Sequence, residues 1–413
     1  MVYRSLGDNH YIRQTCRLCR SEDLVRVLEL TPTALCDAYT KVQKRAEVYP
    51  LNLYLCRDCG FVQIDCVVDP ETIYRDYLFV TTSSLPLQKH FASYAKDIVM
   101  RLSGRADPLV VDLGSNEGTL LREVSKLGLR VLGVEPAIEI AEKANRDGVP
   151  TLPEFFDEKI VENVKQTHGL ADAVTVNNLF ANVDDLHGFV ANVKDILKPG
   201  GLFIVESSYL GDMIENMVFD FIYHEHLSYL SVKPLKNFFE QQEMSLIDVL
   251  RVGTKGGSLR YYASNLGADN STTLNVDEWL KSENKKELYE ITKYDQYAEK
   301  ILKGKSDLNG FLSNYQKESV IGYGASATST TLIYHYDLSN KLDCLVDDNP
   351  AKVSTFSPGL NIPVRETKEI YRAGVEVVVI LAWRYAKEII QKHSRFNGVF
   401  VIPLPELVIH QES

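Results

Sequence analysis

Short apolar, β-prone segments alternate with segments of helical periodicity through the middle of the chain. The β-prone segments lie at 109–114, 130–136, 171–180 and 201–208. Helical patterns such as 119–128 and 137–148 separate them. Alternation of this kind predicts a parallel sheet that carries helices on both faces, so it places the chain in the α/β class.

The segments on either side of this region extend the predicted sheet. Residues 85–103 have apolar positions at helical spacing, which predicts an amphipathic helix before the first strand. The sequence LKPGG at 197–201 predicts a turn that ends a helix and begins a strand. Segments 245–252 and 257–264 flank the short turn GTKG, which predicts an antiparallel hairpin at one end of the sheet.

A second strand–turn–helix unit begins at 319–333, and the β-prone segments 342–349 and 375–383 follow it. Residues 266–315 are polar and predicted to be helical, with a break at Gly310. A chain of 413 residues is too long for one ordinary core. We therefore predict three domains, at 1–80, 81–266 and 267–413.

Six of the seven cysteines lie within the first 66 residues, and four of them form two CxxC pairs separated by 36 residues. Each pair presents two thiolates to one side of a tight turn, and two pairs complete a tetrahedral shell with no open position. Such a metal is structural, and it supplies folding energy that a module of this size lacks. The predicted zinc ligands are Cys16, Cys19, Cys56 and Cys59. Cys36 and Cys66 are predicted to be buried small residues.

Composition excludes several classes of protein. The hydrophobic share of 45% and the charged share of 24% are typical of a soluble globular protein. There is no run of about 18 apolar residues to cross a membrane, and the first residues resemble no secretion leader. We therefore expect a cytoplasmic protein without a membrane partner. A net charge of −11 argues against nucleic-acid binding but allows an anionic small molecule. The oligomeric state stays open, a monomer included.

The sequence VVDLGSNEGTLL predicts the end of a strand, a sharp turn and the start of a helix. Gly114 allows the turn, Gly118 allows close packing of the helix, and Asn116 tolerates a left-handed conformation. With Asp112 this pattern suits S-adenosylmethionine better than a dinucleotide. Glu135 ends the next strand, where it can accept hydrogen bonds from both ribose hydroxyls. The alternative is a tight turn without a ligand, but the ordered strands and the terminal hairpin favour a methyltransferase.

Seven short stretches occur in the order CRLC, YPLNLYLCRDCGFVQ, DLGSNEGTLL, GVEPA, YHEHLSYLS, KGGSLRYY and GYGASATSTTL…VDDNPAK. With these stretches the chain resembles the three-domain sugar C-methyltransferases, which act on nucleotide-linked 4-keto-deoxysugars and supply branched sugars of antibiotics and surface polysaccharides. The resemblance spans nearly the whole chain. It implies a small zinc-binding N-terminal module, a seven-stranded Rossmann-like methyltransferase core that uses S-adenosylmethionine, and a second Rossmann-like α/β domain at the C-terminus.

The stretch YHEH places Tyr223, His224, Glu225 and His226 in a row. Histidines two residues apart diverge on a helix, and the metalloprotease pattern with histidines four apart is absent. A second metal site and a purely structural loop are the alternatives to acid–base chemistry. Methylation of carbon requires a carbanion equivalent. A ketone makes the adjacent C–H acidic enough for an imidazole, which titrates near the working pH.

The resemblance assigns roles to these residues. His226 is the candidate base, Glu225 orients it or handles the proton, and Tyr223 donates to the developing enolate oxygen. A second tyrosine of the family's site corresponds to Tyr77, with Tyr74 as the alternative.

Further residues are expected to bind ligands. Asn178 is expected near the cofactor and Asn182 near the sugar, where relatives tend to carry a histidine that could relay a proton. The anionic nucleotide needs donors, and the predicted contacts on the substrate side are His224, Lys255 and Arg260. A plain hairpin turn with a solvated lysine is the alternative at 253–260.

Three other functions stay open. The first is O- or N-methylation of a related sugar, which needs no C–H abstraction. The second is a zinc-and-nucleotide-binding protein without catalysis. The third is a dehydrogenase that binds a nicotinamide cofactor at the C-terminal turn GYGASA. Beside a complete methyltransferase core, that turn is expected to close over the sugar nucleotide or to serve the fold alone.

Overall fold

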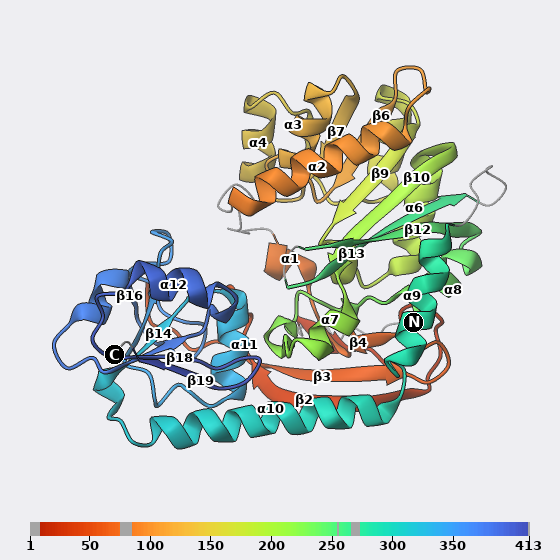
Figure 1. Ribbon diagram of the computed structural model, residues 1–413. Helices are drawn as coiled ribbons and strands as arrows, with labels where there is room; N and C mark the ends of the chain where they lie inside the picture. Colours follow the sequence, from red (N-terminus) through yellow and green to blue (C-terminus); the bar gives the residue numbers. More distant parts are fainter. Residues whose placement is uncertain (1–8, 75–84, 254–255, 266–272, 412–413) are drawn as a thin grey trace.

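The protein is described by a computed structural model over residues 9–74, 85–253, 256–265 and 273–411. Three β-sheets and a two-stranded ribbon organise these residues; in Figure 1 the central sheet is at the upper right, the N-terminal sheet lies beneath it, and the C-terminal sheet is at the lower left. No helix among the described residues is both long enough and apolar enough to cross a bilayer.

The central sheet has seven strands in the order β12-β13-β10-β9-β6-β7-β8. Strands β6 to β10 run parallel, while β13 is antiparallel to both of its neighbours. The bounds are β6 Leu109–Leu113, β7 Arg130–Val134, β8 Thr151–Leu152, β9 Ala171–Asn177, β10 Leu197–Ser208, β12 Met244–Val252 and β13 Ser258–Asn265. The predicted parallel sheet and its terminal hairpin are confirmed.

Helices cover both faces of this sheet because its strands are apolar on both sides. Along β6, Val110 packs into one core and Leu109 and Val111 pack into the other, as the alternation of a strand requires. Helices α2 (Leu85–Arg101), α3 (Thr119–Lys126) and α4 (Ile138–Arg146) cover the first face. Helices α5 (Glu158–Thr167), α6 (Leu186–Ile196) and α8 (Val232–Gln241) cover the second. The predicted helix at 85–103 is α2.

The N-terminal sheet contains a strand from the middle of the chain. Its order is β11-β4-β3-β2, and β11 (Ser228–Tyr229) pairs antiparallel with β4 (Val62–Ile64). The other members are β2 (Leu24–Thr33) and β3 (Tyr49–Cys56). A separate ribbon joins β1 (His10–Ile12) to β5 (Cys66–Val68), and the short helix α1 (Pro70–Tyr74) follows it. The YHEH stretch therefore lies directly before a strand that belongs to the N-terminal sheet.

The C-terminal sheet has six strands in the order β16-β15-β14-β17-β18-β19, all parallel except β19. The bounds are β14 Val320–Tyr323, β15 Cys344–Asp347, β16 Val364–Glu366, β17 Val377–Ile380, β18 Val399–Ile402 and β19 Val408–Gln411. Helices α11 (Ala327–His335) and α12 (Ala386–Lys392) belong to this unit. The predicted second α/β domain is confirmed.

Two details differ from expectation. Helix α9 (Leu274–Lys285) is followed by α10 (Ile291–Leu312), which runs along β2 toward the C-terminal sheet and continues past Gly310 (Figure 1). The predicted break is wrong because one exposed glycine costs only about 1 kcal/mol, and the burial of Leu308 and Leu312 outweighs it. The predicted turn at 197–201 is instead the irregular start of β10.

Candidate active site

The GSNEG turn lies at the carboxyl end of β6, where the strand order of the central sheet reverses. Gly114, Asn116 and Gly118 have left-handed backbones, with φ of 68°, 51° and 71°. A Cβ at position 114 would lie 3.0 Å from the side chain of Leu179, and one at position 118 would lie 2.7 Å from Val149. The predicted sharp turn and close packing are therefore present. The carboxyl edge at such a reversal is where open α/β sheets bind ligands.

Two buried carboxylates flank the turn. Glu135 accepts the backbone N–H groups of Asn116 (2.9 Å) and Ala137 (3.0 Å), and burial raises its pKa. A carboxylate has about four lone-pair positions, so Glu135 can accept further hydrogen bonds from ribose hydroxyls. Asp112 accepts from Thr175 Oγ1 at 2.6 Å and Asn177 Nδ2 at 3.0 Å, and burial raises its pKa to about 7. Both carboxylates lie where the sequence predicted a cofactor site.

Replacement of Gly118 by alanine is expected to lower both stability and affinity for S-adenosylmethionine. The new methyl group would meet Val149, and the left-handed backbone would be strained as well. Gly128→Ala is the matched control, because Gly128 has φ 92° and a Cβ at that position would meet nothing within 4 Å. Thermal unfolding and calorimetric titration with S-adenosylhomocysteine check this. Equal losses in the two variants would show that close packing at 118 is unimportant.

A pocket opens at the carboxyl ends of β9 and β10. Asn178 follows β9 with a left-handed backbone and donates its N–H to the Glu206 carbonyl at 2.8 Å. His226 lies in the same pocket. The other lining residues are Ala181, Ser207, Ser208, Tyr209, Leu210, Met213, Val218, Phe221, Ser228, Tyr229, Gly256 and Gly257. The edge of the parallel sheet and the YHEH segment, which we define as residues 220–229, therefore meet at one cavity.

The ring of His226 is held in a defined orientation. Its Nδ1 lies 2.9 Å from the Phe221 carbonyl, and its ring lies 4.1 Å from the ring of Tyr223, centroid to centroid. A carbonyl oxygen can only accept, so Nδ1 carries the proton. In the neutral ring the basic lone pair is then on Nε2. Tyr223 and Glu225, its neighbours in the chain, are both nearly buried and are not among the residues that line the pocket. The contact with Phe221 therefore sets the tautomer of this imidazole.

The neighbouring His224 points elsewhere. It is buried, its Nε2 lies 3.1 Å from the Pro50 carbonyl, and its ring packs edge-on against Tyr49. Burial lowers the pKa of His224 to about 4. The prediction of a substrate contact for His224 is corrected, because the ring packs into the N-terminal module and does not line the pocket.

His224 is expected to make stability depend on pH. In the unfolded chain the imidazole is protonated below about pH 6.5, whereas the folded protein keeps it neutral down to about pH 4. The unfolded state therefore binds more protons in this window, and stability is lost as pH falls through it, by roughly 3 kcal/mol in total. Denaturant unfolding at pH 7 and pH 4.5 should show a smaller loss for His224→Gln than for the wild type. Equal losses would contradict the burial argument.

Arg260 also differs from expectation. Its guanidinium pairs with Glu206 at 2.8 Å and lies 3.3 Å above the ring centre of Tyr94. Burial raises the pKa of Glu206, but hydrogen bonding from His90 and the charge of Arg260 together hold it below the usual value. Arg260 is therefore committed to an internal ion pair, which corrects its prediction as a donor to the nucleotide. Lys255 and Tyr77 lie outside the described residues.

Asn182 lies in the 3₁₀ turn η2 (Phe180–Asn182), next to the pocket residue Ala181. Its Oδ1 is buried and makes no hydrogen bond to the described residues. The sequence did not single out Tyr209, Ser228 or Tyr229. The last two directly extend the YHEH stretch, so their position beside it was the available signal.

Contacts from both the N-terminal and the C-terminal domain hold the YHEH segment in place. Asp220 is fully buried and accepts from Trp383 Nε1 at 2.9 Å and Arg384 Nη1 at 3.1 Å, both from the C-terminal domain. The Ile222 carbonyl accepts from Thr331 Oγ1 of α11 at 3.1 Å. From the N-terminal side, β4 pairs with β11 immediately after the segment's histidines. The proposed base thus lies at a junction of all three parts of the chain.

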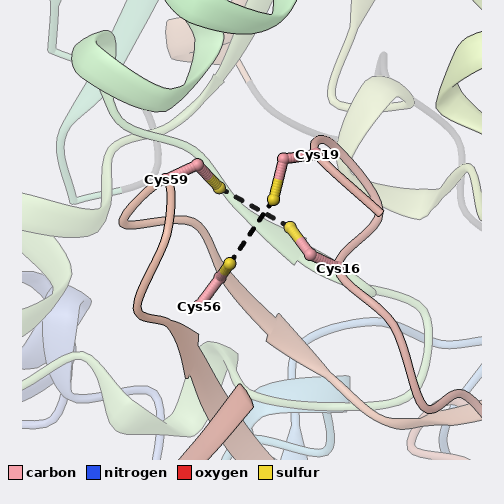
Figure 2. Close-up of side chains that lie close together, drawn as sticks. All are labelled: Cys16, Cys19, Cys56 and Cys59. Atoms are coloured by element: carbon pink, nitrogen blue, oxygen red, sulfur yellow. Dashed lines mark hydrogen bonds between the residues drawn. The ribbon is translucent and has the colours of Figure 1, made fainter. Parts of the chain in front are cut away.

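The four predicted zinc ligands converge (Figure 2). Their sulfur atoms all lie within 4.8 Å of one another, with Cys16 to Cys59 at 3.6 Å and Cys19 to Cys56 at 3.5 Å. A tetrahedral zinc with Zn–S bonds of about 2.3 Å requires sulfur atoms about 3.8 Å apart, so the group fits. Cys36 and Cys66 are buried outside the group, as predicted. The four-cysteine site is closed and structural.

The two knuckles have the same backbone geometry. In each, the N–H four residues after the first cysteine donates to that cysteine's carbonyl: Arg20 to Cys16 at 3.0 Å and Gly60 to Cys56 at 2.9 Å. Arg20 and Gly60 are also both left-handed. This repeated turn aims both sulfur atoms of each pair at one point.

The C-terminal glycine turn satisfies its own polar groups. Asp347 ends β15, where a dinucleotide fold would hold a ribose. Its carboxylate accepts the backbone N–H of Ala325 at 2.6 Å and of Asn349 at 2.8 Å. Ser326 caps helix α11. Glu135 beside the GSNEG turn makes the same pair of contacts, so the two roles expected of this turn, to close over the sugar nucleotide or to serve the fold alone, stay predictions.

Comparisons with known proteins agree along the chain. Family models match for a zinc binding domain (residues 16–74), a methyltransferase domain (87–249) and a C-methyltransferase C-terminal domain (253–405). The C-methyltransferase NovU of Streptomyces niveus is 30% identical over 408 residues, which cover 96% of this chain and 97% of NovU.

Two further matches are partial. A ubiquinone biosynthesis O-methyltransferase of Methylobacterium sp. (strain 4-46) is 32% identical over 124 residues, 27% of this chain and about half (48%) of that enzyme. The solved magnesium protoporphyrin IX methyltransferase of Synechocystis PCC 6803, with bound S-adenosylhomocysteine, aligns with 46% of this chain and 88% of its own, at 12% identity and a TM-score of 0.35. Because the match to NovU is end to end, the chain belongs to the S-adenosylmethionine-dependent C-methyltransferases with a zinc-binding N-terminal domain and a second α/β domain at the C-terminus.

Proposed function

We propose that the protein transfers a methyl group from S-adenosylmethionine to a carbon beside the keto group of a nucleotide-linked 4-keto-deoxysugar. The observation that carries the proposal is the meeting of Asn178 and His226 in one pocket at the carboxyl edge of the central sheet. An oriented imidazole in that pocket can remove a proton from the carbon beside a carbonyl, as transfer to carbon requires, and the match to C-methyltransferases favours carbon over oxygen or nitrogen.

The chemistry follows from the orientation of His226. Its Nε2 takes the proton from the carbon beside the carbonyl, the C–H electron pair forms a carbon–carbon double bond, and the carbonyl π pair moves onto oxygen to give the enolate. The Tyr223 hydroxyl donates a hydrogen bond to the enolate oxygen as charge develops there. Bound S-adenosylmethionine supplies an electrophilic methyl carbon, and the enolate carbon forms the new bond as the sulfur–carbon bond breaks. Glu225, next to His226 in the chain, handles the proton after His226 has taken it, because the Phe221 carbonyl already orients the imidazole.

Several pocket groups suit a sugar. Three serines, Ser207, Ser208 and Ser228, and two glycines of the hairpin turn, Gly256 and Gly257, are among the residues that line the pocket. Such groups can donate to and accept from a sugar ring without adding charge. We propose Asn182 as a further sugar contact. We also propose Asp112, Glu135 and the GSNEG turn as the adenosine and methionine side of the site, in a protein that works on a soluble nucleotide sugar.

The test is turnover with a panel of nucleotide-linked 4-keto-deoxysugars. With S-adenosylmethionine present, we expect a product heavier by one methylene, with NMR placing the new methyl on carbon. Without the methyl donor, in deuterium oxide, we expect deuterium to enter the sugar beside the carbonyl. A methyl on oxygen or nitrogen, with no exchange, would favour the rival function. Binding without turnover across the panel would favour a binding protein.

A further inference from the structure

Arg17 lies between two zinc ligands in the first knuckle, yet its side chain is fully buried. Its Nη1 donates to the Ile64 carbonyl at 2.6 Å and to the Leu227 carbonyl at 3.2 Å, and its Nε donates to Asp184 Oδ1 at 2.9 Å. Its backbone N–H donates to Gln63 Oε1 at 2.8 Å. Burial of a guanidinium is unfavourable unless each contact is well placed, so this residue needs an explanation beyond metal binding.

Two partners of Arg17, Leu227 and Asp184, belong to segments that contribute residues to the pocket. Leu227 directly follows His226, and its carbonyl also accepts the N–H of Ile64 at 3.0 Å. Asp184 lies two residues beyond Asn182, in the segment that begins with Asn178. One guanidinium therefore touches the segment of the proposed base and the segment on the cofactor side. No other side chain among the described contacts joins these two segments through the zinc knuckle.

We propose that Arg17 is a positioning residue. It holds the YHEH segment and the 178–184 segment in register, and it transmits the rigidity of the zinc-bound knuckle to the pocket. This inference rests on the proposed function, because it assigns the base role to His226. A misplacement of about 1 Å at a reacting group can slow a reaction about a hundredfold, so such a residue can matter without touching substrate.

Arg13 provides a matched control within the same cluster. It pairs with the same carboxylate, Nη1 to Asp184 Oδ2 at 3.0 Å, and its Nε donates to the Thr15 carbonyl at 3.0 Å. Among the described contacts it does not reach Leu227 or Ile64. Loss of Arg13 therefore removes a positive partner of Asp184 and leaves the link to the YHEH segment intact.

The experiment compares Arg17→Met, Arg17→Lys and Arg13→Met in the intact, zinc-loaded chain. Arg17→Met should slow solvent deuterium exchange into the keto sugar and kcat at least tenfold. Its zinc content and its Kd for S-adenosylhomocysteine should stay within twofold of the wild type. Arg17→Lys should give values between those of Arg17→Met and the wild type, because a lysine keeps the charge but cannot reach all three acceptors. Arg13→Met should stay within twofold in every measurement.

Amide hydrogen exchange gives a readout that does not depend on activity. Peptides that cover 222–229 should exchange at least threefold faster in Arg17→Met and unchanged in Arg13→Met. The proposal would be overturned if zinc-loaded Arg17→Met showed wild-type rates both of amide exchange at 222–229 and of deuterium exchange into the keto sugar. If that variant does not fold, Arg17→Lys takes its place, and the same wild-type values there overturn the proposal.

The failure of this inference is distinguishable from failure of the proposed function. If the wild type shows no deuterium entry into any keto sugar, the base role of His226 is wrong. The amide exchange of 222–229 would still show whether Arg17 holds the segment. If deuterium enters the keto sugar with the wild type and enters at the same rate with the Arg17 variants, only the positioning role is wrong.

Discussion

Replacement of His226 by asparagine is expected to abolish deuterium exchange into the keto sugar and to slow methyl transfer by about 10²–10⁴-fold. The asparagine amide nitrogen can lie where Nδ1 lies and still donate to the Phe221 carbonyl, so the segment keeps its anchor. What the variant lacks is the basic nitrogen. The measurements are proton NMR of the sugar in deuterium oxide without methyl donor, and single-turnover methyl transfer with it.

His224→Gln is the matched control for that experiment. It removes the adjacent imidazole, which faces Pro50 and does not line the pocket, and a glutamine amide can replace its hydrogen bond. We expect this variant to be less stable but to exchange deuterium at the wild-type rate once folded. Exchange that persists in His226→Asn and disappears in His224→Gln would show that the base is assigned to the wrong histidine.

Loss of the zinc site is expected to produce the largest change in stability. Structural zinc binds with about 10–16 kcal/mol in small zinc-dependent peptides, as much as the whole stability of an ordinary domain. Cys19→Ala combined with Cys56→Ala removes one ligand from each knuckle. We expect this variant to lose its zinc, to unfold at its N-terminal sheet and to lose methyl transfer. Metal analysis, circular dichroism and the turnover assay measure these effects.

Cys66→Ala separates zinc loss from the loss of a buried sulfur. Cys66 is fully buried in the same part of the chain but lies outside the metal group. We expect it to keep zinc and activity with a small loss of stability. Full activity in the zinc-free double variant would show that the metal site is independent of the pocket.

Much of this architecture could be predicted because its determinants are local. The CxxC pairs fix their own turns, so spacing alone identified the metal ligands. The glycines at 114 and 118 occur where only left-handed backbone fits, and the alternating segments that follow are long enough to show their period.

The errors and omissions come from contacts between distant parts of the chain. His224 and His226 are alike in sequence, and contacts with the distant Tyr49 and Pro50 hold the His224 ring away from the pocket. In the sequence Arg260 is like any other strand residue, and only the fold places Glu206 beside it. Strand β11 has two residues, too few for a periodic pattern, and its partner lies more than 160 positions earlier.

The pairing of β11 with β4 limits how such enzymes can be divided into separate domains. A methyltransferase core excised from its neighbours would retain the donor turn and the central sheet. It would lose the β4 partner of β11, the hydrogen bond from Thr331 to the Ile222 carbonyl, and the hydrogen bonds to Asp220 from the C-terminal domain. Chimeras that join this core to flanking domains of other proteins should therefore still bind the methyl donor. We expect carbanion chemistry in them only when all three domains come from the same protein.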